Sequence, residues 1–276
     1  PTMTLVAAGV QMRTLLSLDE TRDSPLFQGP YVSLSRAFRQ GASIDELASE
    51  GIFHPGMRDR IPGDITHVYG HQEEAIRAIH ARKTTLVSTG TGSGKTECFL
   101  YPLISQCLDL KQADADPGIS AVIVYPMNAL AEDQLLRMRS LLAGTQIPFG
   151  MYVGKTPERE SDVVGIRLPA GASRADYEAK VEELREQGQS ETVYPAEELC
   201  SRQVMRTPGE QPRILLTNVK QLELLLTRQK DVELFSGARL DYLVFDEAHT
   251  FAGAQGAETA CLIRRLRSFC ERDPSD

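Results

Sequence analysis

The sequence has no tryptophan, only 6% aromatic residues and no excess of basic side chains. Its 30 Lys and Arg are outnumbered by 38 Asp and Glu, which gives a formal net charge of −8. A dedicated basic nucleic-acid module is therefore excluded, and any nucleic-acid contact must be local or shared with another domain. No apolar run approaches the ~18 residues of a membrane-spanning helix, and the first residues lack a signal-peptide pattern, so we expect no membrane partner.

Cysteine is also scarce, and its spacing excludes two further classes of protein. The five cysteines are an odd number, lie far apart and form no Cys-x-x-Cys pair, so neither a disulfide framework nor a zinc site is expected. A reduced, cytoplasmic protein is the expectation. Because the chain begins at Pro1 rather than Met, we expect a fragment or a processed chain.

The remaining composition, 41% hydrophobic and 25% charged over 276 residues, is that of a globular protein. Residues 1–60 predict an N-terminal, mostly helical arm that serves as a packing appendage. Within it, Ser43 with Glu46 three residues later predicts a short helix ending near Gly51. Residues 61–276 are expected to form a second domain.

From Tyr69 onward, helical patterns alternate with short apolar strands. Helices are expected at 71–82 and 96–110, and strands at 84–88, 121–125, 213–217 and 240–245. Repeated β-then-α units predict an α/β fold with a mostly parallel sheet flanked by helices. Residues 157–210 interrupt this order with four prolines, no clear strand and a Glu-rich helix at 174–187. We interpret this stretch as an insertion on the rim of the sheet, either a solvated excursion or an arm that grips substrate.

The segment between the strand expected at 84–88 and the next helix has the pattern of a phosphate-binding loop. Its glycines allow successive backbone N–H groups to face phosphate oxygens, Lys95 supplies positive charge, and Thr96 offers a hydroxyl to Mg²⁺. Thr89 stands where the strict pattern has glycine. The residues expected to bind nucleotide here are Thr89, Gly90, Thr91, Gly92, Ser93, Gly94, Lys95 and Thr96.

The partner signal is Asp246 with Glu247, directly after the apolar strand expected at 240–245. Asp246 would hold Mg²⁺, and Glu247 would orient or deprotonate the water that attacks the γ-phosphate. Taken alone, such a pair is usually found at the start of a helix. After a phosphate-binding loop, the catalytic interpretation is favoured.

These residues, with others between Tyr69 and Arg267, resemble motifs of superfamily 2 DEAD/DEAH-box helicases. Gly90–Thr96 resembles motif I, Asp246–His249 motif II, and Tyr125–Gln134 motif Ia. The stretch His249–Arg267 is similar to the branch that holds mitomycin repair helicases and the large helicases of phage-defence systems such as DISARM.

The resemblance implies the first RecA-like domain of a helicase, with ATP and Mg²⁺ as cofactors and Lys95, Asp246 and Glu247 as catalytic residues. It also implies that Gln72 reads the adenine edge and that His249 couples the nucleotide to the nucleic acid, although a lone His in such a place is more often structural. The residues implied to bind nucleic acid are Pro126, Asn128, Thr156, Thr217 and Asn218. For Asn218, helix capping is the alternative role.

We therefore expect the ATP-binding lobe of an ATP-dependent helicase or translocase that acts on nucleic acid, with DNA favoured over RNA, in repair or phage defence. Nothing after His249 resembles a second lobe, so that lobe, and further subunits of a repair or defence complex, are expected partners. Without the second lobe, slow ATP hydrolysis is expected. The alternative is a module that ATP binding switches between conformations without unwinding.

Overall fold

The computed structural model describes residues 38–90, 92–126 and 128–271, with the side chains of 128–130 left aside. Contacts divide the chain into two units, Pro1–Phe38 and Arg39–Asp276. The expected arm falls largely on residues 1–37, which lie outside the described residues. Residues 39–60, which we had expected to belong to that arm, are part of the second unit, to which everything below refers.

A parallel sheet of four strands, in the order β4-β7-β3-β8, forms the centre of this unit. Its strands are β3 (Ala121–Tyr125), β4 (Phe149–Met151), β7 (Ile214–Asn218) and β8 (Tyr242–Phe245). Every residue of β3 is buried, because this strand is paired on both edges and covered on both faces. The expectation of a parallel sheet is thus confirmed.

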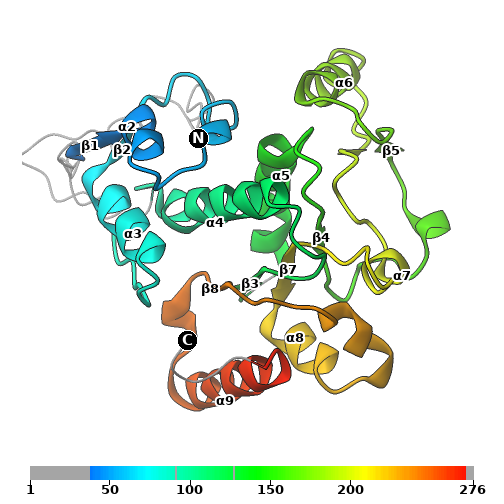
Figure 1. Cartoon of the computed structure of the whole chain (residues 1–276). Coiled ribbons are helices and arrows are strands. Elements are labelled where there is room, and N and C mark those ends of the chain that lie inside the picture. The colour runs from blue at the N-terminus through cyan, green and yellow to red at the C-terminus, as the bar shows by residue number, and fades with distance from the viewer. Residues whose placement is uncertain (1–37, 91, 127, 272–276) are drawn as a thin grey trace, which may run out of the picture. The chain divides into compact units, whose positions relative to one another are not determined.

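Helices α4 (Lys95–Gln112) and α5 (Asn128–Leu142) cover one face of the sheet, and α8 (Val219–Leu225) and α9 (Gly253–Phe269) cover the other. The remaining α-helices are α2 (Ile44–Ser49), α3 (Gly70–His80), α6 (Arg174–Glu186) and α7 (Arg202–Met205). Short 3-10 helices are η2 (Pro55–Met57), η3 (Glu160–Asp162), η4 (Gln229–Phe235) and η5 (Ala248–Thr250). Figure 1 shows α4 and α5 on one side of the sheet and α8 and α9 on the other.

Successive residues of β3 point to opposite faces, as the pleat of a strand requires. Ile123 joins the cluster that contains buried residues of α4 and α5, whereas Val122 and Val124 join the cluster that contains residues of α8 and α9. The apolar sequence of this strand therefore supplies two cores at once.

The strand expected at 84–88 does not form. These residues have no regular structure, and Leu86 is 82% exposed. A strand is stable only with hydrogen-bonded neighbours, and in the described part of the chain β8 pairs with β3 alone. A β-branched run was thus not enough to predict a strand here. The sequence also missed β4, which has only three residues.

The expected helix after Ser43 is confirmed as α2, with the complete capping box between Ser43 and Glu46. It packs beside a second, antiparallel sheet of β1 (Gln40–Ser43) and β2 (His67–Tyr69). Ile44 and Leu47 are fully buried and share a core cluster with α4. Burial of these side chains is the reason that residues 39–60 belong to the second unit rather than to an arm.

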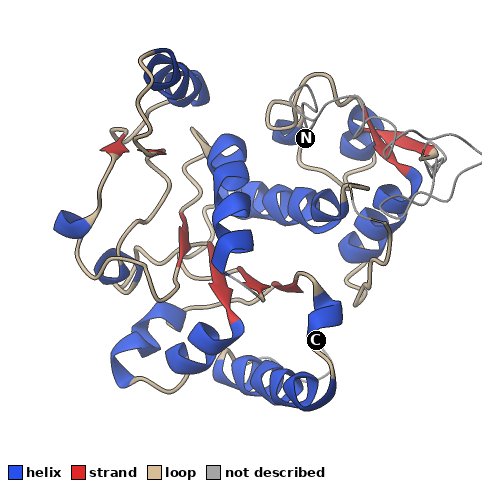
Figure 2. Cartoon of the chain, turned by 180° about the vertical axis from the view of Figure 1, so that it is seen from behind, coloured by secondary structure: helices blue, strands red, loops and turns tan. Residues whose placement is uncertain are grey.

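The insertion at 157–210 is more than a solvated excursion. It contains a small parallel pair, β5 (Ile166–Arg167) and β6 (Val193–Tyr194), which the sequence did not indicate. Its returning segment adds to the edge of the main sheet, because Phe149 donates to Glu197 O (3.0 Å) and accepts from Leu199 N (2.8 Å). Figure 2 shows α6 and the β5–β6 pair standing out from the sheet, while the returning segment runs back to it.

A buried ion pair fastens this segment to α5. Arg139 donates from Nε and Nη2 to the two carboxylate oxygens of Glu198 at 2.5 and 2.8 Å, and its guanidinium lies over the Tyr194 ring. Both charged side chains are less than 10% exposed. Burial raises the pKa of Glu198 even beside Arg139, which indicates how poorly this carboxylate would be tolerated alone.

No helix in the described part of the chain is long and apolar enough to cross a membrane. All five cysteines are described, and none of them forms a disulfide.

We predict that Arg139→Met lowers the free energy of unfolding by about 3–5 kcal/mol, because it leaves a buried carboxylate without its partner. Urea unfolding measures this change. Arg185→Met is the matched control, since Arg185 is 80% exposed on α6, and it should change stability by less than about 0.5 kcal/mol. The double variant Arg139→Met/Glu198→Met should recover most of the loss. Equal midpoints for the two single variants would contradict the importance of the pair.

Candidate active site and nucleic-acid edge

The functional residues predicted from the sequence gather at one edge of the main sheet. Because all four strands are parallel, their carboxyl ends meet there, which is where α/β sheets bind ligands. Thr156 follows β4, Asn218 ends β7, Pro126 follows β3 and Asp246 follows β8. The residues predicted to bind nucleic acid and the predicted catalytic acids therefore lie along one edge of the sheet. The acids are at the β8 end of that edge.

The phosphate-binding loop folds tightly before α4. Gly92 and Gly94 both have φ +73°, a region that glycine enters without steric cost, and Gly94 is the N-cap of α4. The Lys95 ammonium donates to the Thr89 carbonyl at 3.2 Å. The charge thus sits inside the curve of the loop, above the amino end of an 18-residue helix, which favours anions.

Thr89 is compatible with the loop despite the departure from the strict pattern. Its φ is not in the left-handed region, so a side chain is tolerated, and its hydroxyl bonds to that of the buried Ser93 at 2.6 Å. Of the predicted nucleotide-binding residues, Thr91 lies outside the described residues.

Gln72 closes on this loop from α3. Its carbonyl accepts from Tyr69 N at 2.7 Å, its amide donates to Gly94 O at 2.9 Å, and only 5% of the residue is exposed. Next to it, the His71 ring contacts Ser93 O at 2.9 Å. The glutamine that the sequence singled out therefore lies directly against the phosphate-binding loop. The contribution of His71 had no signal in the sequence.

Asp246 continues the ladder of β8, since its N–H donates to Val124 O at 3.0 Å. Burial raises its pKa, and the neighbouring Glu247 acts in the same direction, while the N–H of Glu247 (2.8 Å) and the charge of Lys95 oppose the shift. The charge of Lys95 of α4 therefore acts on the carboxyl group of Asp246 at the end of β8. Figure 1 shows the turn after β8 on the same side as α3 and the start of α4.

Glu247 adopts a backbone conformation that is unusual for its residue type, with φ +49° and ψ +44°. Such left-handed geometry costs a non-glycine residue about 1–3 kcal/mol and is typical of functional sites. The Glu247 carboxylate is within 3.2 Å of the His249 ring nitrogen Nδ1, and His249 is 78% exposed. The predicted catalytic and coupling residues are thus neighbours.

An ion pair that the sequence did not indicate connects the phosphate-binding loop with the proposed nucleic-acid edge. Glu97, in the first turn of α4, forms an ion pair with Arg137 of α5. Glu97 is buried and one of its carboxylate oxygens has no hydrogen-bond partner in the described structure. The pair joins the helix that begins at the phosphate-binding loop to the helix that begins at Asn128. Sequence shows both charges, but only the tertiary structure shows that these helices are adjacent.

Two threonines predicted to bind nucleic acid have hydroxyls that are already engaged. Thr217 is fully buried and donates to Tyr152 O at 2.8 Å. Thr156 is 8% exposed, donates to Met151 O at 2.7 Å and accepts from Val153 N. These two side chains shape the edge of the sheet.

The three other residues predicted to bind nucleic acid are Asn218, Pro126 and Asn128. Asn218 caps α8 by accepting from Gln221 N at 2.7 Å, which agrees with its alternative role. Pro126 is partly exposed beside it along the edge. The side chain of Asn128 lies outside the description.

The exposed groups on this edge belong to Gly154 and Lys155, which the sequence did not single out. Lys155 is 75% exposed and lies 3.3 Å from Glu132, and a side chain added at Gly154 would meet nothing within 4 Å. A Gly-Lys pair in a loop is too common in sequences to be a signal by itself.

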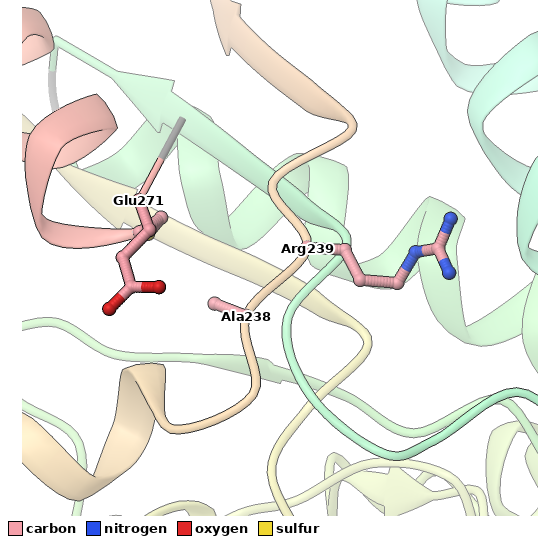
Figure 3. A pocket seen from close by; sticks show the side chains of 4 residues that line it. Ala238, Arg239 and Glu271 are labelled. Carbon is pink, nitrogen blue, oxygen red and sulfur yellow. The ribbon is translucent and has the colours of Figure 1, made fainter. Parts of the chain in front are cut away.

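A hollow of about 440 Å³ lies elsewhere and is lined by Ala238, Arg239, Cys270 and Glu271. It is near the amino end of β8, and Figure 3 shows the Arg239 and Glu271 side chains pointing away from each other. Without convergent polar groups it is no match for the phosphate-binding edge.

The fold is that of a RecA-like lobe, in which the loop that contains Lys95 and the acidic end of β8 lie at the carboxyl edge of the sheet. Residues 69–169 match the family described as "DEAD/DEAH box helicase". This part of the chain is therefore similar to the helicase domain of the DEAD/DEAH-box family.

Comparisons with individual proteins agree. The chain is 28% identical to "Druantia protein DruE" of Escherichia coli (strain UMEA 4076-1), over 93% of this chain and 18% of the relative. It is 26% identical to "Uncharacterized ATP-dependent helicase YprA" of Bacillus subtilis (strain 168), over 85% and 24%. Among solved structures, "DUF1998 helicase MrfA bound to DNA and AMPPNP" has a TM-score of 0.54 at 23% identity, over 86% of this chain and 26% of that one. The chain thus spans between 18% and 26% of the length of these proteins.

We predict that Lys95→Ala weakens binding of a fluorescent ATP analogue by about 10- to 100-fold, the value of one or two charge-assisted hydrogen bonds. The unfolding midpoint should not change, because Lys95 contacts only a loop carbonyl. Lys83→Ala, an exposed lysine on the approach to the loop, is the control for loss of charge. If both variants bind the analogue equally, the nucleotide site is not where we place it.

Proposed function

We propose that this chain is the ATP-binding lobe of an ATP-dependent superfamily 2 helicase or translocase that acts on nucleic acid. The observation that carries the proposal is the phosphate-binding loop before α4, in which Lys95 donates to the Thr89 carbonyl at 3.2 Å. The end of β8 adds Asp246, whose pKa is influenced by the charge of Lys95. Phosphoryl transfer depends mainly on positioning and charge stabilisation, and a buried strand paired to the rest of the sheet provides a rigid base for both.

In this proposal the phosphates of ATP lie in the loop from Thr89 to Thr96, where the ammonium of Lys95 exchanges the Thr89 carbonyl for phosphate oxygens. The adenine edge is read by Gln72, whose amide already lies at Gly94. Its contact with the loop would transmit the presence of the base to the phosphates.

The donor set also fits Mg²⁺ that arrives with the nucleotide. Thr96 and Asp246 are hard oxygen donors, and Mg²⁺ is commonly held by one or two protein oxygens with phosphates and waters. No group of three or more His, Cys, Asp or Glu side chains in the described residues could hold a metal by itself. When bound, the ion would neutralise charge on the phosphates.

Glu247 is the proposed base or orienting group for the attacking water, and His249 is the proposed coupling residue. The 3.2 Å contact between their side chains supports this pairing. A change in the position of Glu247 would move the exposed imidazole, which is suited to contact other parts of a complex.

For nucleic acid, we propose contacts to the strand backbone along the carboxyl ends of β4, β7 and β3, through Pro126, Asn128 and Asn218. The buried Thr156 and Thr217 would hold the backbone of this edge in place. Short polar side chains and loop amides bind phosphates without reading bases. DNA is favoured over RNA because the similar MrfA structure is described as bound to DNA, and repair or phage defence is the proposed setting.

We further propose a second RecA-like lobe and other subunits as partners, since the relatives are four or more times longer than the matched region. A cytoplasmic location is supported by the absence of disulfides among the five cysteines. An ATP-switched module that does not unwind is the rival function; strand displacement by the full-length protein on tailed duplexes separates the two.

We expect Glu247→Gln to keep affinity for the ATP analogue and to lower single-turnover hydrolysis in the full-length protein by at least about 100-fold, because an amide cannot accept the proton of water. Glu258→Gln, an exposed change of the same type on α9, should leave hydrolysis unchanged. A parallel loss of binding and hydrolysis would assign Glu247 a role in binding instead.

A further expectation concerns oligonucleotide binding by this 276-residue chain. With a net charge of −8 and half of a groove, it should bind single-stranded DNA weakly, with affinity that falls as salt rises and does not depend on base sequence. Fluorescence anisotropy with several DNA and matched RNA oligonucleotides at two salt concentrations measures this. Tight, sequence-selective and salt-insensitive binding would contradict the proposed edge.

A further inference from the structure

The insertion sends one side chain to the exposed loop that follows β4. Arg202, at the start of α7, donates from Nη2 to the carbonyl oxygens of Val153 (2.9 Å) and Gly154 (2.8 Å). These are successive peptide groups on the edge where nucleic acid is proposed to bind. The Val153 carbonyl also accepts from the Thr156 N–H at 3.1 Å, whereas Arg202 provides the one hydrogen bond to the Gly154 carbonyl among the described residues.

The direction of these carbonyls fixes the direction of the next two amides. In a trans peptide the C=O of one residue and the N–H of the next point opposite ways, and the described chain has no cis peptide bond. With the carbonyls of Val153 and Gly154 turned to Arg202, the N–H groups of Gly154 and Lys155 point away from it. Both residues are exposed, and neither amide donates a hydrogen bond within the described structure.

Two successive N–H groups that face outward form an anion-binding concavity. The ammonium of Lys155, 75% exposed, adds positive charge, and the lack of a side chain at Gly154 leaves its approach open, since an added Cβ would meet nothing within 4 Å. A phosphate of a nucleic-acid backbone matches this loop in charge and in hydrogen bonding.

Arg202 is itself held rigidly. Its guanidinium lies over the Tyr152 ring at 5.2 Å, and Glu158 lies 3.8 Å from Nη1. Tyr152 in turn donates to the fully buried Asp231 at 2.7 Å. This packing gives the loop a fixed backbone orientation before any ligand arrives, which lowers the entropy cost of binding.

We propose that Arg202 is a positioning residue for nucleic-acid binding: by holding the carbonyls of Val153 and Gly154 it presents the amides of Gly154 and Lys155 to a backbone phosphate. The inference rests on the proposed function of this edge. It gives the insertion a role in substrate binding, acting from behind the loop without touching the strand.

The test is anisotropy of a fluorescein-labelled single-stranded DNA at several salt concentrations with wild-type chain, Arg202→Gln and Arg185→Gln. Arg185, 80% exposed on α6, gives the same change of charge away from the loop. Arg202→Gln should raise Kd about tenfold over that control and make the salt slope shallower by about 0.7, the value of one phosphate on a single strand. Affinity for the ATP analogue and the unfolding midpoint should match the control.

A double-variant cycle with Lys155→Ala separates positioning from a general structural effect. If Arg202 acts through this loop, Arg202→Gln should weaken binding less in the Lys155→Ala background than alone, because the variants disable one phosphate contact. Additive effects would overturn the inference.

The remaining outcomes are also decisive. If Arg202→Gln fails to fold, Arg202→Lys keeps the charge beside Glu158 but not the planar fork, and Kd should rise about threefold. Equal Kd values for Arg202 variants and the Arg185 control overturn the inference while leaving the proposed function intact. Absence of DNA binding by the wild-type chain at low salt contradicts the proposed function itself.

Discussion

The pairing of β3 with a parallel strand on each edge is the constraint on which the rest of the structure depends. It aligns the carboxyl ends of β7, β3 and β8, and its alternating side chains bury α4 and α5 on one face and α8 and α9 on the other. Asp246 extends this ladder by one hydrogen bond to Val124. An acid placed by the sheet and a lysine placed by a helix packed on that sheet can keep their relative position without further support.

Two ion pairs with buried carboxylates connect parts that lie far apart in sequence. Arg139 with Glu198 joins the insertion to α5, and Glu97 with Arg137 joins α4 to the same helix. Such pairs add little net stability compared with apolar contacts, but removal of one partner is costly. They therefore specify one arrangement of α4, α5 and the insertion, and α5 is the helix that begins at the proposed nucleic-acid edge.

Residues along the proposed nucleic-acid edge have two different roles: some are exposed to a ligand, and others hold the backbone in place. The hydroxyls of Thr156 and Thr217 are spent on holding the backbone, whereas Gly154 and Lys155 remain exposed. Motif resemblance points to polar residue types near a ligand and does not distinguish these two roles. Burial and hydrogen-bond partners do, which is why the predicted set and the exposed set differ.

The sequence alone predicts the parallel α/β fold, the phosphate-binding loop, the acidic pair and the limits of β3. Each of these depends on a local pattern, namely glycine spacing, an apolar run or acids at a strand end. Tertiary structure decided the rest. Leu86 and its neighbours form no strand for lack of a paired neighbour, residues 39–60 join the larger unit through Ile44 and Leu47, and Arg202 reaches a loop that precedes it by almost 50 residues. Contacts between residues distant in sequence depend on how elements pack, which no local pattern records.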